Sequence, residues 1–211
     1  MHHVKKSFFI TFEGGEGVGK TTQIQLLASW LKKKGYSTLL THEPGGTPMA
    51  NRIRQILLHS DHVNPYTELF LYETARRDHV TKVIHPALKK GHVVLCDRFT
   101  DATLAYQGYA RGLPLKLIQA FNQVATDGLQ PNLTFVFDLP VSEGLERVRK
   151  RQKGLDRLEK EHLKFHEKVR NAYLTLAQKE KRRFCIINAR KNRSEIFTSI
   201  SYEVEKRLRK K

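Results

Sequence analysis

The stretch Gly14-Gly15-Glu16-Gly17-Val18-Gly19-Lys20-Thr21 decides the fold of this chain, because it matches the pattern G-x-x-x-x-G-K-[ST] at every fixed position. The apolar run 8–12 precedes it and predicts a strand, and the apolar residues Ile24, Leu27, Ala28 and Leu31 follow it at helical spacing. Strand, glycine-rich loop and helix together are the context that this pattern requires. The sequence therefore predicts a cradle for the phosphates of ATP or GTP.

The chemistry of this loop follows from its residue types. The glycines let the backbone curl so that its N–H groups converge on one point, and the following helix adds its positive N-terminal end. Lys20 is expected to reach the outer phosphates, and the Thr21 hydroxyl to coordinate Mg²⁺. The alternative, a glycine-rich turn that binds nothing, is disfavoured by the flanking strand and helix.

Composition indicates one domain of 211 residues with a net charge of +17, and the basic excess is concentrated after residue 140. Such a charge suggests polyanionic partners, either nucleotides or nucleic acid; the alternative is a solvated basic surface. No apolar run approaches the roughly 20 residues of a membrane span, and residues 1–6 lack the apolar core of a signal peptide, so we expect a cytoplasmic protein without a membrane partner. Cys96 and Cys185 are expected to be core thiols.

Four further strand-like runs follow the loop, at 37–41, 92–96, 133–137 and 184–188, and helical patterns separate them. This alternation predicts an α/β fold with a five-stranded parallel sheet covered by helices on both faces. The pattern also predicts one long helix over 66–90, a short helix over 99–107 and a mobile loop around Arg111, between Gly108 and Gly112.

Candidate ligand-binding side chains lie outside the glycine-rich loop as well. Asp97 and Arg98 directly follow a buried-type strand, where an aspartate can organise a metal ion. Tyr72 and Arg76 are four residues apart and share a helix face, so that the ring could stack on a base and the guanidinium could bond its edge. The alternative is a core aromatic beside a surface arginine. Thr103 and Gln107 fall on one side of the predicted short helix, with Tyr106 adjacent to them.

Several spaced motifs together resemble those of bacterial thymidylate kinases over nearly the whole chain. The segments 13–22 and 43–47 are similar to that family's first and second loops. Asp97-Arg98-Phe99 with Ala105-Tyr106-Gln107-Gly108 is the most discriminating match. The resemblance implies a P-loop nucleoside monophosphate kinase-like three-layer sandwich with a lid, a homodimer, and transfer of the γ-phosphoryl group of ATP to dTMP, giving dTDP, with Mg²⁺ as cofactor. One departure is His42, where the family usually has arginine.

The same resemblance implies a role for each matched residue. Gly14 to Thr21 would bind ATP, Arg98 would hold the acceptor phosphate, and Asp97 would orient Arg98 or bind the metal through water. Tyr72 would stack on thymine and Arg76 would reach its O4. Thr103 and Gln107 would contact the remaining edge of the base. Tyr106 would pack against the sugar where a 2′-hydroxyl would sit, and Glu16 would bind the 3′-hydroxyl.

The basic segment at about 147–158 resembles the lid of the subgroup that supplies its catalytic arginines from the lid, and Glu rather than Arg at position 16 agrees with that subgroup. Arg149 and Arg151 are the candidates for closing over the bridging oxygens, with Lys20 and Arg98 as the other catalytic cations. The alternative is a solvated basic helix.

Two other functions fit parts of the sequence. A kinase for another monophosphate, such as dUMP, CMP or a guanine nucleotide, would share the fold. A nucleic-acid-binding P-loop ATPase would explain the positive charge, but no aromatic residues interleave with the basic runs as a single-strand platform requires. Nucleic acid is therefore not expected as a partner.

Overall fold

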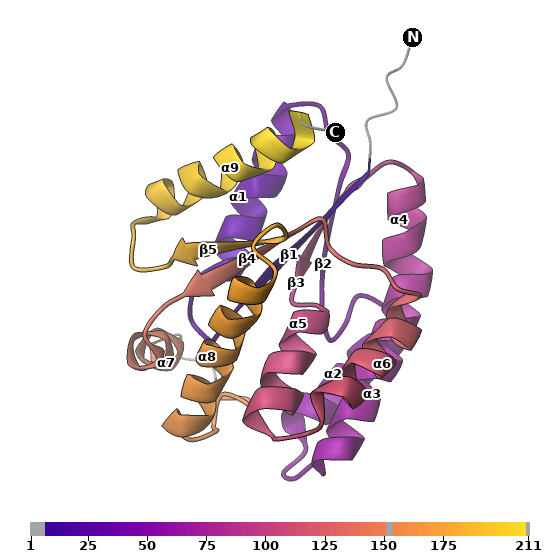
Figure 1. The fold of residues 1–211 in the computed structure, drawn as a ribbon, viewed down its shortest axis with the longest axis vertical. Coiled ribbons are helices and arrows are strands. Elements are labelled where there is room, and N and C mark those ends of the chain that lie inside the picture. The colour runs from indigo at the N-terminus through magenta and orange to yellow at the C-terminus, as the bar shows by residue number, and fades with distance from the viewer. Residues whose placement is uncertain (1–6, 151–153, 210–211) are drawn as a thin grey trace.

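All five strands expected from the sequence lie in one parallel sheet in the computed structural model, which describes residues 7–150 and 154–209 (Figure 1). The order across the sheet is β2-β3-β1-β4-β5. The strands are β1 (Phe8–Gly14), β2 (Thr38–His42), β3 (Val93–Asp97), β4 (Leu133–Asp138) and β5 (Phe184–Asn188). The prediction of an α/β fold with a parallel sheet is thus confirmed.

Helices fill the connections between the strands. They are α1 (Lys20–Lys33), α2 (Pro48–His59), α3 (Pro65–His79), α4 (His85–Lys89), α5 (Thr100–Thr103), α6 (Leu115–Thr126), α7 (Val141–Arg149), α8 (Leu163–Lys179) and α9 (Arg193–Arg209), with two π-helical segments, η1 (Val80–Ile84) and η2 (Leu104–Ala110). Within 7–150 and 154–209, none of the helices combines the length and the apolar character that crossing a bilayer demands.

The sheet is covered on both faces because its strands are apolar on both sides. Ile10 and Phe12 of β1 face a core that includes Leu27 of α1 and Ile200 of α9. Phe9 of β1 faces the opposite core, which η1 and α4 supply. Figure 1 shows α1 and α9 together on one side of the sheet. Full burial of such residues is typical of parallel sheets with three layers.

The strand register places the functional segments together. β1 pairs with β3 so that Phe12 lies opposite Asp97, and it pairs with β4 on its other side. Because parallel strands end at the same edge of the sheet, the glycine-rich loop after β1 and the Asp97-Arg98 pair at the end of β3 emerge side by side. The ligand-binding edge is therefore fixed by the central strands.

The helix predicted over 66–90 is helical throughout, from Pro65 to Lys89, but its middle is the π-helical turn η1, because Pro86 lacks the N–H that a regular helix would bond to Lys82. One local expectation was wrong. The loop predicted between Gly108 and Gly112 is helical as far as Ala110. A Cβ on Gly108 would lie 2.5 Å from a methyl group of Leu115, so this glycine lets α6 pack against η2.

Candidate active site

The glycine-rich loop joins β1 to α1 with the backbone conformation that its residues allow. Gly14, Gly17 and Gly19 have φ values of 135°, 68° and 91°, in the region that favours glycine. A Cβ on Gly17 would also collide with the carbonyl oxygen of Gly144. The loop glycines thus permit both the curl of the loop and its close approach to α7.

Lys20 lies at the start of α1 and turns back over the loop. Its Nζ donates to the carbonyl oxygens of Gly15, at 2.9 Å, and Gly14, at 3.2 Å. Burial and then the positive charge of Arg98 lower the pKa of Lys20. Among the described residues, the hydrogen bonds of this buried ammonium group go to neutral carbonyl oxygens, which it is well placed to exchange for phosphate oxygens.

Thr21 and Asp97 provide oxygen ligands beside this lysine. The Thr21 hydroxyl donates to Asp97 Oδ2 at 3.3 Å. Asp97 Oδ1 is buried and has no hydrogen-bond partner among the described residues. The described part of the chain contains no cluster of three or more His, Cys, Asp or Glu side chains that could hold a metal ion. These two residues suit Mg²⁺ nonetheless, because Mg²⁺ commonly takes one or two protein oxygens and completes its shell with water and phosphate.

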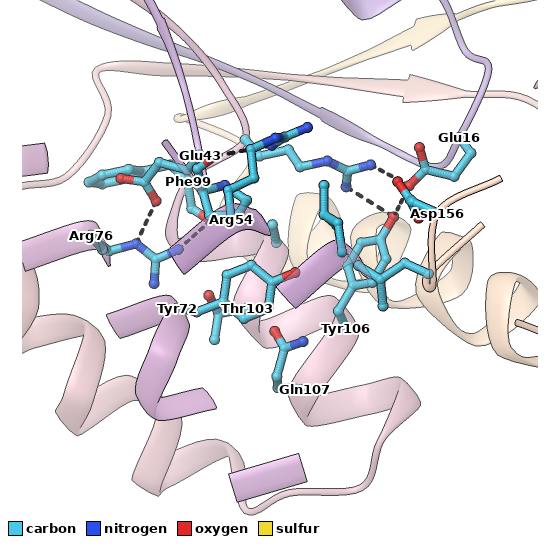
Figure 2. A pocket seen from close by; sticks show the side chains of 15 residues that line it. Glu16, Glu43, Arg54, Tyr72, Arg76, Phe99, Thr103, Tyr106, Gln107 and Asp156 are labelled. Atoms are coloured by element: carbon cyan, nitrogen blue, oxygen red, sulfur yellow. Dashed lines mark hydrogen bonds and ion pairs between the residues drawn. The ribbon is translucent and has the colours of Figure 1, made fainter. Parts of the chain in front are cut away.

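A cavity of about 570 Å³, counting its opening to solvent, lies next to the loop (Figure 2). All seven residues that the sequence predicted for the acceptor nucleotide line it: Glu16, Tyr72, Arg76, Arg98, Thr103, Tyr106 and Gln107. The rest of its wall comes from Glu43, Pro44, Arg54, Leu58, Phe99, Ala102, Asp156 and Leu158. The fold thus brings residues from α3, α5 and η2 to one hollow beside the glycine-rich loop.

Arg98 has an unusual backbone conformation at this cavity. Its φ is 68°, in the left-handed region that non-glycine residues rarely adopt. Two hydrogen bonds hold it there, from Arg98 N to the Phe12 carbonyl at 3.0 Å and from Phe99 N to Glu13 Oε1 at 2.7 Å. Strained backbone of this kind concentrates at functional sites.

The Arg98 side chain is the centre of a partly buried polar network. Its guanidinium donates to Glu16 Oε1 at 2.5 Å and to the Tyr106 hydroxyl at 3.0 Å, and it lies 4.9 Å from the centre of the Tyr106 ring. Tyr106 in turn donates to Glu16 Oε1 at 2.8 Å. Burial alone would raise the pKa of Glu16, but Arg98 and then Lys20 outweigh it and lower that pKa to about 2. Glu16 is therefore ionised throughout the physiological range.

Arg76 is held on the opposite side of the cavity in Figure 2. Its Nε donates to Glu43 Oε2 at 2.7 Å, and its Nη1 donates to Glu73 at 2.8 Å and to Asn122 at 2.7 Å. Burial lowers the pKa of Arg76, but the carboxylates of Glu43 and Glu73 raise it overall. Its Nη2 also donates to the Phe99 carbonyl at 3.2 Å, so these bonds leave one N–H of the guanidinium for a ligand and give the side chain little freedom to move.

Three further side chains supply an aromatic face and polar groups. Tyr72 projects from α3, and Thr103 and Gln107 come from α5 and η2. Thr103 Oγ1 is buried and has no hydrogen-bond partner within the described residues. An orphaned hydroxyl in a cavity wall is costly unless a ligand or water satisfies it.

A second, more open groove follows the glycine-rich loop and joins the cavity. Glu16, Glu43, Arg54, Arg98 and Asp156 line both hollows. Of these, Glu43 and Arg54 were not among the predicted site residues, and Asp156 was expected only as part of the lid at about 147–158. The position of Glu43 after the second strand was a usable signal, whereas Arg54 on α2 could not be told from a surface arginine.

The basic segment is only partly accounted for. Arg149 is exposed at the end of α7 and lines neither hollow, whereas Arg147 lines the groove along the glycine-rich loop. Arg151, the other candidate, lies outside the described residues.

Comparison with known proteins gives one consistent match. The family model described as thymidylate kinase matches residues 12–200. A thymidylate kinase of a Synechococcus species is 51% identical to this chain, over 95% of this chain and 95% of its own length. The thymidylate kinase of Geotalea daltonii is also 51% identical, over 95% of this chain and 97% of its own length. The crystal structure of thymidylate kinase from Ehrlichia chaffeensis superposes with a TM-score of 0.78 at 32% identity, covering 94% of this chain and 99% of that one.

Proposed function

Since the chain belongs to the thymidylate kinase family, and so transfers the γ-phosphoryl group of ATP to dTMP, giving dTDP, we propose that dTMP binds in the cavity of Figure 2 and the ATP phosphates in the adjoining groove. The observation that carries this assignment is that Glu16 and Arg98 line both hollows. An acceptor phosphate bound at Arg98 would face a donor held by the glycine-rich loop, Gly14 to Thr21.

The mechanism that we propose is positioning with charge neutralisation. The phosphate of dTMP is ionised at neutral pH, so its attack on the γ-phosphorus needs no general base. Arg98 suits the acceptor phosphate because a planar guanidinium can bond two oxygens. Burial lowers the pKa of Arg98, but nearby groups, Glu16 above all, raise it well above its ordinary value, so Arg98 stays charged. Lys20 would neutralise the outer phosphates of ATP from the other side.

The remaining cavity residues would recognise the nucleoside. Tyr72 would stack on thymine, Arg76 would donate to its O4, and Thr103 and Gln107 would contact the other polar atoms of the base. Tyr106 would press against the sugar and exclude a 2′-hydroxyl, while Glu16 would accept the 3′-hydroxyl. In support, the buried Thr103 hydroxyl has no partner among the residues described, and an unpaired donor discriminates strongly between ligands.

We propose that Mg²⁺ binds at Thr21 and Asp97, with Asp97 acting directly or through water. The unpaired Asp97 Oδ1 supports this assignment. When bound there, Mg²⁺ would neutralise charge on the β- and γ-phosphates.

We further propose that residues 147–158 form a lid on a single kinase domain spanning 1–211. Arg149 and Arg151 remain the candidates for the catalytic lid cations, and the position of Arg147 in the groove wall adds it to them. Asp156 and Leu158 already line the dTMP cavity, which supports a covering role for this segment.

A homodimer through α3 and α6 is also proposed. Phe70 of α3 and Val124 of α6 are 52% and 72% exposed, and Phe70 packs edge-on against Phe121 with ring centres 5.6 Å apart. Exposed apolar groups gathered on two neighbouring helices fit a self-complementary interface. For location we propose the cytoplasm, where the free thiols of Cys96 and Cys185 would stay reduced.

The acceptor profile of the purified enzyme tests the assignment. With ATP and Mg²⁺, a coupled assay of ADP release should show dTMP and dUMP accepted far better than ribonucleotides or purine monophosphates. Preference for GMP or CMP would contradict the proposed base and sugar contacts.

A further inference from the structure

Glu68 is a fully buried carboxylate on α3 that lies behind the cavity wall and does not line it. We propose that Glu68 is a positioning residue that determines base selectivity, by holding the Gln107 amide with its oxygen toward the bound base. This inference rests on the proposed function, in which the cavity binds dTMP.

The contacts of Glu68 define which atom of Gln107 it engages. Gln107 Nε2 donates to Glu68 Oε1 at 2.6 Å, and Arg157 Nη2 donates to Glu68 Oε2 at 2.5 Å. Arg111 Nε approaches Oε1 more loosely, at 3.4 Å. An ionised carboxylate can only accept hydrogen bonds, so the amide nitrogen rather than the oxygen must face it. The Gln107 oxygen is then the atom offered to a ligand.

This orientation matches one class of pyrimidine. Thymine and uracil carry an N–H at position 3, which a carbonyl oxygen accepts, whereas cytosine carries an unprotonated acceptor nitrogen at that position. An acceptor facing an acceptor leaves both buried groups unpaired, which weakens binding. Glu68 therefore favours thymine and uracil over cytosine without touching either.

The same carboxylate anchors the segment that covers the cavity. Arg157 lies between the cavity-lining residues Asp156 and Leu158, and its Nε donates to the Leu57 carbonyl at 2.9 Å. Arg157 thus requires an acceptor at position 68. Glu68→Gln would satisfy it with the new amide oxygen and turn the new amide nitrogen toward Gln107. Gln107 would then have to present its own oxygen to position 68 and its nitrogen to the base.

The test is the ratio of kcat/KM values for dTMP, dUMP and dCMP. Glu68→Gln should lower kcat/KM for dTMP and dUMP together by about tenfold, the effect of losing one hydrogen bond to a polar group, and should raise the dCMP to dTMP ratio at an unchanged dUMP to dTMP ratio. Because all three acceptors are measured on one preparation, these ratios do not depend on the fraction of folded enzyme.

Two matched variants serve as controls. Glu161→Gln makes the same chemical change in the same charge cluster, since Glu161 pairs with Arg111 at 2.7 Å, and it should leave the ratios unchanged. Glu68→Asp keeps an acceptor and should retain the wild-type dCMP to dTMP ratio. In a Gln107→Ala background, Glu68→Gln should no longer shift that ratio.

An equal fall for all three acceptors, the same shift with Glu161→Gln, or a persistent shift in the Gln107→Ala background would overturn the inference. If the wild-type enzyme itself fails to prefer dTMP over dCMP, the proposed function is wrong. If it prefers dTMP and Glu68→Gln leaves the ratios unchanged, only the role of Glu68 is wrong.

Discussion

Arg98→Lys separates the geometry of the Arg98 side chain from its charge. The guanidinium bonds Glu16 and Tyr106 in the structure and, in the proposed function, holds two oxygens of the acceptor phosphate. Lysine keeps the positive charge but offers a point charge in place of a planar fork. The backbone strain at φ 68° is the same for both residues, so the change tests the side chain alone.

The expected loss follows from the bonds that lysine cannot make. A hydrogen bond to a charged group contributes about 1.5–3 kcal/mol, and the loss of roughly two of them costs about 3–6 kcal/mol, or roughly 10²–10⁴-fold in kcat/KM for dTMP. Steady-state kinetics with ATP in excess measures this loss directly. We expect most of it in kcat, because the bonds to the acceptor phosphate position it for transfer.

Arg183→Lys is the matched control. Arg183 is 13% exposed against 18% for Arg98, it holds Asp101 through two bonds of 2.6 and 2.9 Å, and it lies 4.1 Å from the Phe184 ring. It does not line the dTMP cavity. This variant should lower the melting temperature and leave kcat/KM within a few-fold. If Arg98→Lys kept more than about a tenth of wild-type kcat/KM, or lost no more than the control, the reasoning would be refuted.

Three further predictions test other parts of the site. Asp97→Asn should raise the Mg²⁺ concentration for half-maximal velocity by about tenfold or more, and an unchanged Mg²⁺ titration would contradict the metal assignment. The folded-state pKa of Glu16 is about 2, below its ordinary 4.5, so Glu16 contributes stability that is present above pH 4.5 and lost as the pH falls toward 2. Urea unfolding between pH 4.5 and pH 2 should therefore show a smaller loss of stability for Glu16→Gln than for the wild type. An equal loss in both proteins would argue against the Arg98 and Lys20 contacts. Phe70→Asp should convert a wild-type dimer to a monomer in analytical ultracentrifugation, whereas a dimeric variant would exclude this face as the interface.

The sequence predicts the sheet and the glycine-rich loop because both are encoded locally. The apolar run 8–12 and the loop after it need no distant residue to be recognised. The π-helical turn at Val80–Ile84 was not predicted, because the periodicity continues through Pro86 and a wider turn accommodates it.

The candidate site depends on contacts across the chain, and spacing alone could not supply them. Tyr72 and Gln107 lie on different elements, and their meeting in one cavity was expected only through the family resemblance. Glu68 gave no signal, since its partners Gln107 and Arg157 are 39 and 89 residues away. A buried charge is recognisable only when the groups that neutralise it are known.

The central claim is that dTMP occupies the cavity with its phosphate at Arg98, facing the glycine-rich loop. A crystal structure with dTMP and a non-hydrolysable ATP analogue tests it most directly. We expect the dTMP phosphate within hydrogen-bond distance of the Arg98 guanidinium, the thymine ring against Tyr72, and the triphosphate along Gly14 to Thr21. A dTMP phosphate bound away from Arg98, with the base outside the wall formed by Tyr72 and Gln107, would contradict the account.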